Sequence, residues 1–197
     1  MNEARLQQQL AFIVEIDRLK SVLRQTRLID DSRRENSAEH SWHLAVMAAL
    51  LGEYAEPGTN MAYVVKMVLI HDIVEIDAGD AFAYDPAANE GKEEREEQAA
   101  QRLFGLLPDD QRDELLGLWH EFEAQNTPES RFANALDRLQ PLLINYHSGG
   151  GTWKKAGVTL DKVRGRMAPI GNASAALGQY VETILEDSVT KGFLQRE

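Results

Sequence analysis

The chain has 197 residues, enough for one domain with a substantial core, and its composition of 43% hydrophobic and 27% charged residues is that of a globular protein. It contains no cysteine, which excludes disulfides, thiolate metal sites and a catalytic cysteine, so any metal site must use imidazole and oxygen ligands. The net charge of −11, from 32 acidic and 21 basic residues, argues against a nucleic-acid polymer as a partner, whereas binding of a small phosphorylated substrate depends on charges within about 8 Å.

Helical periodicity begins near the N-terminus. A first helix is predicted over about residues 6–28, because six apolar residues fall near one stripe: Leu10, Ile13, Val14, Leu19, Val22 and Leu23. A second helix is predicted from Ser37, a candidate N-cap, with Glu39 in the first turn, where the helix dipole favours a negative charge. It is expected to end at about residue 54, before the breaker Pro57-Gly58.

The next predicted helix is the most apolar one. It runs from about residue 59 to just before Gly79 and carries valine, leucine or isoleucine on most faces, so we expect it to be central and buried. Residues 80–91 are predicted to form a loop. An acidic helix is predicted over about residues 92–104, with its glutamates on a solvated face.

Prolines mark the start of the two helices that follow. Pro108 opens a helix with large apolar residues, which are Leu115, Leu118, Trp119 and Phe122. Thr127-Pro128 caps and opens another helix, which contains Asp137. Pro141 lies inside this helix and cannot donate a hydrogen bond to the carbonyl of Asp137, so a kink is expected there.

The C-terminal part is also predicted to be helical. Glycines 149–151 indicate a flexible loop, and a last helix is expected over about residues 173–191. Because no segment shows the alternation of a strand, we predict an all-α fold with one domain over residues 1–197, a core at about 19–146 and a helical extension over 152–197. No apolar run is long enough to span a bilayer and no secretory signal is seen, so a cytoplasmic protein without membrane contact is expected.

The middle of the chain places ionisable residues in apolar surroundings. His71 and Asp72 are adjacent within a run of valine, leucine and isoleucine, and Glu75 follows four and three residues later, on the same side of a helix. A buried ionised carboxylate must be paired or bound to a metal, and Asp137, in another apolar helix, has the same requirement. One divalent cation between these helices would satisfy all of these groups.

Each of these residues also has a simpler interpretation. A His-Asp pair is common by chance, Asp137 beside Arg138 is typical of a salt bridge, and His40 is typical of a histidine at a helix start. Structural roles are assigned to the three remaining histidines, His43, His120 and His147. The combination of residues, and no single one of them, favours a metal site.

Two longer motifs point to a known family. Residues 33–41 read Arg-Arg-Glu-Asn-Ser-Ala-Glu-His-Ser, and His71-Asp72-Ile73-Val74-Glu75 is followed by Gly79-Asp80. With Asp137 downstream, this order resembles that of the HD superfamily, whose helical proteins bind a divalent metal through a histidine, a His-Asp pair and a distant aspartate. The resemblance covers about residues 19–146 and is closest to the branch of HD-type 5′-nucleotidases, which implies an HD-type helical bundle.

The resemblance also implies a role for each site residue. One divalent ion (Mn, Co, Ni, Fe, Zn or Mg) would be held by His40, His71, Asp72 and Asp137. Glu75 matches the acidic residue near the scissile phosphate and would act as the general acid–base, and Asp80 matches a residue that faces the substrate. Arg33, together with Arg34, would neutralise the phosphoryl oxygens.

The implied function is hydrolysis of a phosphate monoester, with a nucleoside 5′-monophosphate as substrate, by a homodimer. Deoxynucleotide-preferring members carry an Arg-Trp pair before the first metal histidine, and residues 29–32 of this chain contain no tryptophan. Three alternatives stay open: a non-catalytic regulator that binds metal or nucleotide, a hydrolase of phosphodiesters or nucleoside triphosphates, and an oxidative enzyme, which would need further histidine ligands.

Overall fold

The computed structural model of the chain describes residues 3–154 and 158–196, whose regular structure is almost entirely helical. The first half contains α1 (Glu3–Glu15), η1 (Ile16–Ser21), β1 (Leu23–Arg27), β2 (Arg34–Asn36), α2 (Ser37–Leu51), η2 (Gly52–Tyr54), α3 (Met61–Ile70), η3 (His71–Val74) and α4 (Glu75–Ala78). The second half contains α5 (Pro86–Asn89), α6 (Lys92–Phe104), α7 (Asp109–Ala124), α8 (Pro128–His147), η4 (Gly151–Lys154), α9 (Leu160–Ala173) and α10 (Ala175–Thr190). The predicted all-α class is confirmed.

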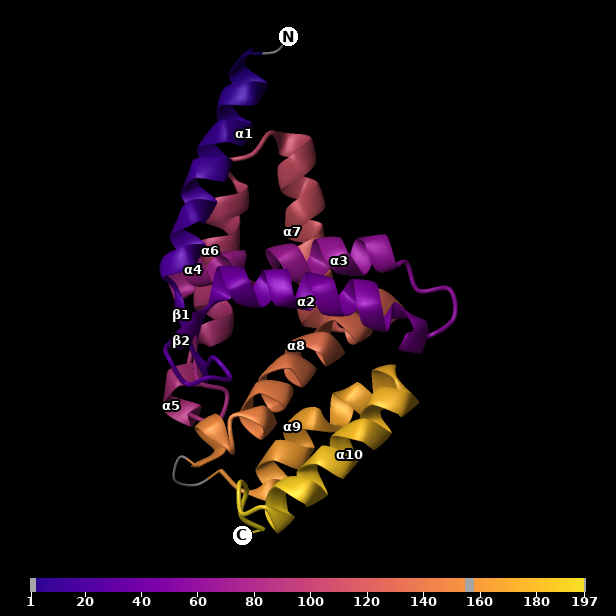
Figure 1. Cartoon of the computed structure of the whole chain (residues 1–197). Helices are drawn as coiled ribbons and strands as arrows, with labels where there is room; N and C mark the ends of the chain where they lie inside the picture. The colour runs from indigo at the N-terminus through magenta and orange to yellow at the C-terminus, as the bar shows by residue number, and fades with distance from the viewer. Residues whose placement is uncertain (1–2, 155–157, 197) are drawn as a thin grey trace.

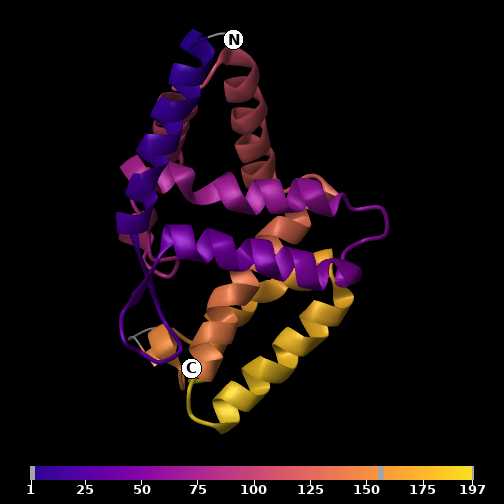
Figure 2. The same cartoon turned by 45° about the horizontal axis from the view of Figure 1, so that its top comes forward.

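The helices are arranged around α2, α3 and α8. Helices α2 and α3 run side by side across the middle of the molecule, and α8 packs against both of them (Figures 1 and 2). Helices α1, α6 and α7 extend to one end, while α9 and α10 form a pair at the other end, with α9 packed along α8. Large side chains that are almost fully buried fill the centre, among them Leu44, Met67, Phe132, Leu136 and Leu139.

The N-terminal segment is not the long helix predicted for residues 6–28. Helix α1 gives way to the 3₁₀ helix η1 and then to strand β1. Leu19 of the expected stripe is buried, and so is Phe12. Three other members of the stripe are exposed on α1, namely Leu10, Ile13 and Val14. Periodicity shows that a helix has an apolar face, but it does not show whether that face has a partner.

A two-stranded antiparallel ribbon precedes α2, so the prediction that the chain has no strand is wrong. Leu23 of β1 lies opposite Asn36 of β2, and Arg27 lies opposite Arg34. The guanidinium of Arg34 donates hydrogen bonds across the ribbon to the backbone carbonyls of Leu23 and Arg24. The strands are short and mostly polar, so they lack the alternation by which a strand is recognised in a sequence.

The predicted central helix is buried as expected but is not continuous. Val64, Met67 and Val68 of α3 are inaccessible to solvent. The His-Asp pair lies in the 3₁₀ turn η3, between α3 and the short α4. Gly79 ends α4 with a φ of 75°, a left-handed conformation that favours glycine.

The predicted helices further along the chain are confirmed to within a few residues. Helix α8 continues through Pro141, which therefore does not end it. Helix α5 lies in the segment predicted as a loop, and α9 is an additional helix before the predicted last one. Residues 155–157 and 197 of the expected C-terminal extension lie outside the described residues.

Helix α7 turns its large apolar residues inward. Leu118, Trp119 and Phe122 are buried in the core, so they are not available for a dimer contact. The expectation of a homodimer therefore rests on the family resemblance alone. Among the residues described, no helix combines the length and the apolar character needed to cross a membrane.

Helices α9 and α10 meet at a pair of glycines. A Cβ atom at Gly178 would lie 2.6 Å from the Cα of Gly171, whereas a Cβ at Gly171 would lie 3.8 Å from the Cα of Gly178. We expect Gly178→Ala to force the helices apart and to lower the free energy of unfolding by about 1–3 kcal/mol in urea denaturation. Gly171→Ala is the matched control and should be near neutral; equal losses in both variants would contradict this view of the contact.

Candidate metal centre

The N-terminus of α2 positions the first histidine. The N-cap is Asn36 and not Ser37, because the Asn36 side chain accepts a hydrogen bond from the Glu39 amide while the Glu39 carboxylate accepts one from the Asn36 amide. This capping box fixes the first turn of the helix. His40 follows in that turn, with none of its side chain exposed, and its Nε2 lies 3.0 Å from Oδ1 of Asp137 in α8.

His71 is held in an orientation that suits a metal ligand. Its Nδ1 lies 2.9 Å from the carbonyl oxygen of Val68, which can only accept, so Nδ1 carries a proton. Its Nε2 is buried and has no hydrogen-bond partner among the described residues. The backbone contact therefore leaves Nε2 to bind a metal ion or a second proton, as is usual for metal-binding histidines.

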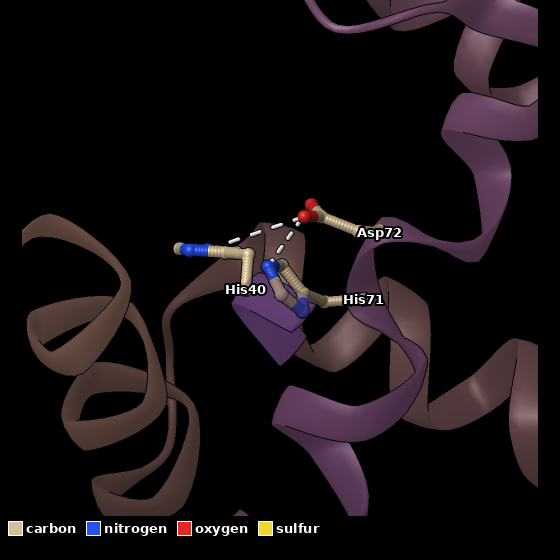
Figure 3. A group of neighbouring side chains, drawn as sticks. All are labelled: His40, His71 and Asp72. Atoms are coloured by element: carbon tan, nitrogen blue, oxygen red, sulfur yellow. Dashed lines mark ion pairs between the residues drawn. The ribbon is translucent and has the colours of Figure 1, made fainter. Parts of the chain in front are cut away.

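The structure brings the four expected ligands together. Potential ligand atoms of His40, His71 and Asp72 all lie within 4.8 Å of one another (Figure 3). His71 Nε2 lies 3.0 Å from Asp72 Oδ1 and 3.8 Å from Asp137 Oδ1. We call these four side chains the HD cluster. Its members come from α2, η3 and α8, the elements that meet at the centre of the fold.

Opposite charges control the protonation of the HD cluster. Burial alone would raise the pKa of Asp72, but His71 and Arg24 outweigh it and hold this pKa below its ordinary value. Burial is likewise outweighed at Asp137, whose pKa is lowered by its contacts with His40 and His71. In return the carboxylates raise the pKa of both histidines against the effect of burial. Protons and a cation therefore compete for the same imidazole nitrogens.

Glu75 is a carboxyl group of a different kind. It lies three residues after Asp72, and a 3₁₀ turn eclipses side chains at this spacing, so the two face the same side. Burial and the charge of Asp72 raise the pKa of Glu75 to about 8. The hydroxyl of Ser37 donates to Glu75 Oε2 at 2.6 Å. A buried carboxyl group with a pKa near neutrality is suited to general acid–base chemistry.

Asp80 lies beside the HD cluster and outside it. It follows Gly79, and its Oδ2 accepts a hydrogen bond of 3.0 Å from the backbone amide of Gln25, which joins this loop to β1. Asp80, Gln25 and Arg24 line one side of a cavity of about 80 Å³ between β1, α8 and α9. Asp80 is thus placed to face a molecule in that cavity.

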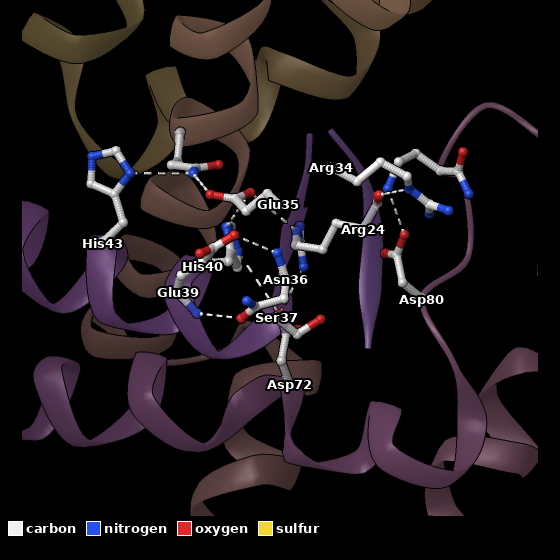
Figure 4. A network of polar contacts seen from close by, with 12 residues as sticks. Arg24, Arg34, Glu35, Asn36, Ser37, Glu39, His40, His43, Asp72 and Asp80 are labelled. Carbon is white, nitrogen blue, oxygen red and sulfur yellow. Dashed lines mark hydrogen bonds and ion pairs between the residues drawn. The ribbon is translucent and has the colours of Figure 1, made fainter. Parts of the chain in front are cut away.

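The arginine that reaches the HD cluster is Arg24, which the sequence analysis did not single out. Its Nη1 donates to Asp72 Oδ2 at 2.7 Å (Figure 4). Its Nη2 lies 3.9 Å from Asp137 Oδ1. Arg33 instead makes a two-pronged ion pair with Glu39, at 2.6 and 2.8 Å, on the exposed side of the cap. Arg34 is engaged with the ribbon carbonyls. Among the described residues, no recorded contact joins Arg33 or Arg34 to the cluster.

Glu35 is a second residue that the sequence analysis missed. It is 2% exposed, and its Oε2 lies 3.6 Å from His40 Nδ1 (Figure 4), whereas Asp137 contacts the other ring nitrogen, Nε2. The side-chain amide of Gln140 donates to Glu35 Oε1 at 2.6 Å and also approaches His43 Nδ1 at 3.3 Å. Glu35 therefore places a negative charge beside the His40 ring, at a distance longer than a hydrogen bond, and helps to raise the pKa of His40 against the effect of burial.

The three remaining histidines have other surroundings. His43 faces Gln140, His120 lies 2.9 Å from Glu97 at the surface, and His147 packs against the ring of Tyr146. None of them belongs to the cluster found among the described residues. The additional histidine ligands that oxidative chemistry would need are thus not supplied by these positions.

The residues of the HD cluster fit a divalent cation. Two imidazole nitrogens and two carboxylates suit Zn, Mn, Fe, Co or Ni. The buried Nε2 of His71, which makes no hydrogen bond among the described residues, has a lone pair that such an ion would bind. The carbonyl of Val68 fixes the ring of His71, and Glu35 places a negative charge beside the ring of His40.

Comparison with known proteins agrees with this geometry. The family model described as HD domain matches residues 16–177, so the chain belongs to the HD-domain family. A solved structure from Magnetospirillum magnetotacticum MS-1, described as a predicted metal-dependent phosphohydrolase, is 55% identical and covers 98% of this chain and 97% of that chain with a TM-score of 0.95.

Curated relatives share the central part of the chain. The human protein named 5′-deoxynucleotidase HDDC2 is 33% identical over 68% of this chain and 65% of its own length. The Xenopus laevis protein of the same name is 30% identical over 76% of this chain and 69% of its own length. For the mouse and bovine relatives the match spans only about half of their length, 53% and 52%.

Glu75 should impose a pH dependence on the stability of the metal-free protein. Its pKa of about 8 lies above the ordinary carboxyl value, so between about pH 5 and 8 the folded state holds a proton that the unfolded state has lost. Stability from this group therefore falls as pH rises, by up to about 1.4 kcal/mol per pH unit. Denaturation of Glu75→Gln across this range should show a shallower decline, while Glu93→Gln on the solvated face of α6 should follow the wild type. Parallel curves for Glu75→Gln and wild type would refute the assignment.

Replacement of Glu35 should weaken metal binding. Glu35→Gln removes the negative charge 3.6 Å from His40 Nδ1, and loss of a carboxylate beside a metal-binding histidine typically costs 10–100-fold in metal affinity. Competition with a fluorescent chelator measures the change, and circular dichroism reports whether the variant folds. Glu93→Gln again serves as the control. Unchanged affinity in a folded Glu35→Gln protein would mean that His40 is oriented by packing alone.

Proposed function

We propose that this chain is a metal-dependent phosphomonoesterase that acts on nucleoside 5′-monophosphates, with the metal held by His40, His71, Asp72 and Asp137. The observation that carries the proposal is the position of His71: the Val68 carbonyl fixes its Nδ1, and its buried Nε2 lies 3.0 Å from Asp72 Oδ1 and 3.8 Å from Asp137 Oδ1 without the geometry of a hydrogen bond to either. A purely structural histidine at this depth would be expected to have both nitrogens satisfied.

The comparisons support the reaction class. The protein that is 55% identical over nearly the whole chain is described as a predicted metal-dependent phosphohydrolase, and the curated relatives are named 5′-deoxynucleotidases. The phosphorylated group of the substrate would lie at the HD cluster, beside Arg24. The substrates tested should include both sugars, because residues 29–32 contain no tryptophan of the Arg-Trp pair that deoxynucleotide-preferring members carry.

Different residues of the site have different roles in the proposed reaction. A bound divalent cation supplies Lewis-acid polarisation of the phosphate and of the attacking water. Glu75 holds a proton near neutral pH and can exchange it with the water or with the leaving oxygen, and Ser37 keeps its carboxyl group in place. Arg24 adds a fixed positive charge for the phosphoryl oxygens. Asp80 can accept a hydrogen bond from a sugar hydroxyl.

Phosphate release tests this function directly. Metal-stripped protein is supplied with Mn, Co, Ni, Zn or Mg and incubated with ribo- and deoxyribonucleoside 5′-monophosphates, nucleoside di- and triphosphates and a cyclic dinucleotide. We expect metal-dependent release from the monophosphates, and a loss of at least 100-fold in Asp72→Asn, which keeps the shape and the acceptor for Arg24 but removes a charged ligand.

Asp113→Asn, a surface change on α7, is the matched control and should retain full activity. Release only from triphosphates or from the cyclic dinucleotide would assign a different phosphate ester to the same site. Metal binding without release from any substrate would overturn the catalytic proposal in favour of a regulator that binds metal or nucleotide.

A further inference from the structure

The cavity beside Asp80 contains a second group of cationic side chains. It is lined by Arg138 of α8 and Arg166 of α9, with Tyr84, Asn145 and Trp153 forming further parts of its wall. We call this part of the cavity the arginine pocket. Its volume of about 80 Å³ has room for several water molecules or one oxyanion, but not for a whole nucleotide.

Among the described residues, the two arginines form no ion pair with a carboxylate. Arg138 Nη1 donates to the backbone and side-chain oxygens of Asn134, at 3.0 and 2.9 Å, and both of these acceptors are neutral. Within the described ranges, neither Arg138 nor Arg166 has a carboxylate oxygen within ion-pair distance, and Arg166 has no recorded hydrogen bond. Arg138 is half-buried and Arg166 is exposed to solvent, so the cavity presents two guanidinium groups to a ligand that enters it.

The two guanidinium groups also influence each other. Burial lowers the pKa of Arg138, the neighbouring Asp137 opposes this, and the charge of Arg166 lowers it further. Burial raises the pKa of Tyr84, and the charge of Arg166 opposes that shift. Arg166 therefore lies close to both Arg138 and Tyr84, and an anion between the arginines would relieve their repulsion.

The arginine pocket is next to the HD cluster but separate from it. None of the four cluster residues lines the cavity. Arg24 connects the two places, because it lines the cavity and donates to Asp72, and Asp137 and Arg138 are consecutive on α8. A phosphate at the HD cluster would be bound by the cation and Arg24. The arginine pocket would therefore be available to a different group of the same molecule.

We propose that the arginine pocket binds a second anionic group of the substrate, so that the preferred substrates are phosphate monoesters carrying another phosphate at a distant position. This inference rests on the proposed function, since it assumes that the first phosphate lies at the HD cluster. The second phosphate would receive charge-assisted hydrogen bonds from Arg138 and Arg166, whose two positive charges outnumber the single carboxylate among the residues that line the cavity, that of Asp80.

Binding measurements separate this inference from the catalytic proposal. The Mn²⁺-loaded protein in a Glu75→Gln background, where turnover is expected to be slow, is titrated calorimetrically with adenosine 5′-monophosphate and adenosine 3′,5′-bisphosphate. We expect the bisphosphate to bind about tenfold more tightly. Adding Arg166→Gln should reduce this ratio to about one, and Arg166→Lys should retain part of it.

Arg164→Gln is the matched control, because Arg164 is on the same helix but pairs with Glu182 and Glu186 of α10. It should leave the ratio unchanged. Equal affinities for the two nucleotides in the parent protein would overturn the inference. So would an Arg166→Gln variant that weakens both nucleotides equally, since the arginines would then hold the single phosphate. Failure to release phosphate from any substrate with Glu75 intact would instead count against the catalytic proposal, and the titration would remain informative.

Discussion

The burial of negative charge at the centre of the fold is the constraint on which the rest of the structure depends. Asp72, Asp137 and Glu35 are three carboxylates close to one guanidinium, that of Arg24, which leaves a formal charge of −2 when both imidazoles are neutral. Unbalanced charge at this depth costs several kcal/mol per ion. The balance can come from protonation of both imidazoles or from one divalent cation. The same field therefore raises the histidine pKa values in the metal-free protein and favours a doubly charged ion.

This constraint explains why an otherwise helical protein contains a β ribbon. Arg24 on β1 and Glu35 on β2 come from opposite strands, and both side chains point toward the HD cluster (Figure 4). A helix in this place would not present two residues eleven positions apart to one point. Arg34 joins the strands through the carbonyls of Leu23 and Arg24, so an arginine expected to bind phosphate instead holds in position the one that reaches the cluster.

The sequence predicted those parts of the site whose chemistry conflicts with their surroundings. His71, Asp72 and Asp137 are ionisable residues in apolar helices, and a conflict of that kind is visible without a structure. Arg24 and Glu35 lie in a polar segment, where an arginine or a glutamate is ordinary, and their burial arises only when the ribbon folds onto α2 and α8. The break of the central helix at η3 could not be predicted either, because its apolar residues fit a continuous helix as well as a 3₁₀ turn.

The position of Arg138 next to Asp137 shows how one helix serves two neighbouring places with opposite charge requirements. Asp137 lies on the side of α8 that meets His40, and Arg138, one residue later, lines the cavity shared with α9. Consecutive helical residues are rotated by about 100° from each other, so α8 can separate a cation-binding face from an anion-binding face. The acidic surface repels extended polyanions, yet close-range charges at both places favour a small anionic ligand, because they act within a Debye length. The net charge of the chain is thus compatible with the proposed small phosphorylated substrate, because that proposal depends on the charges nearest to the ligand.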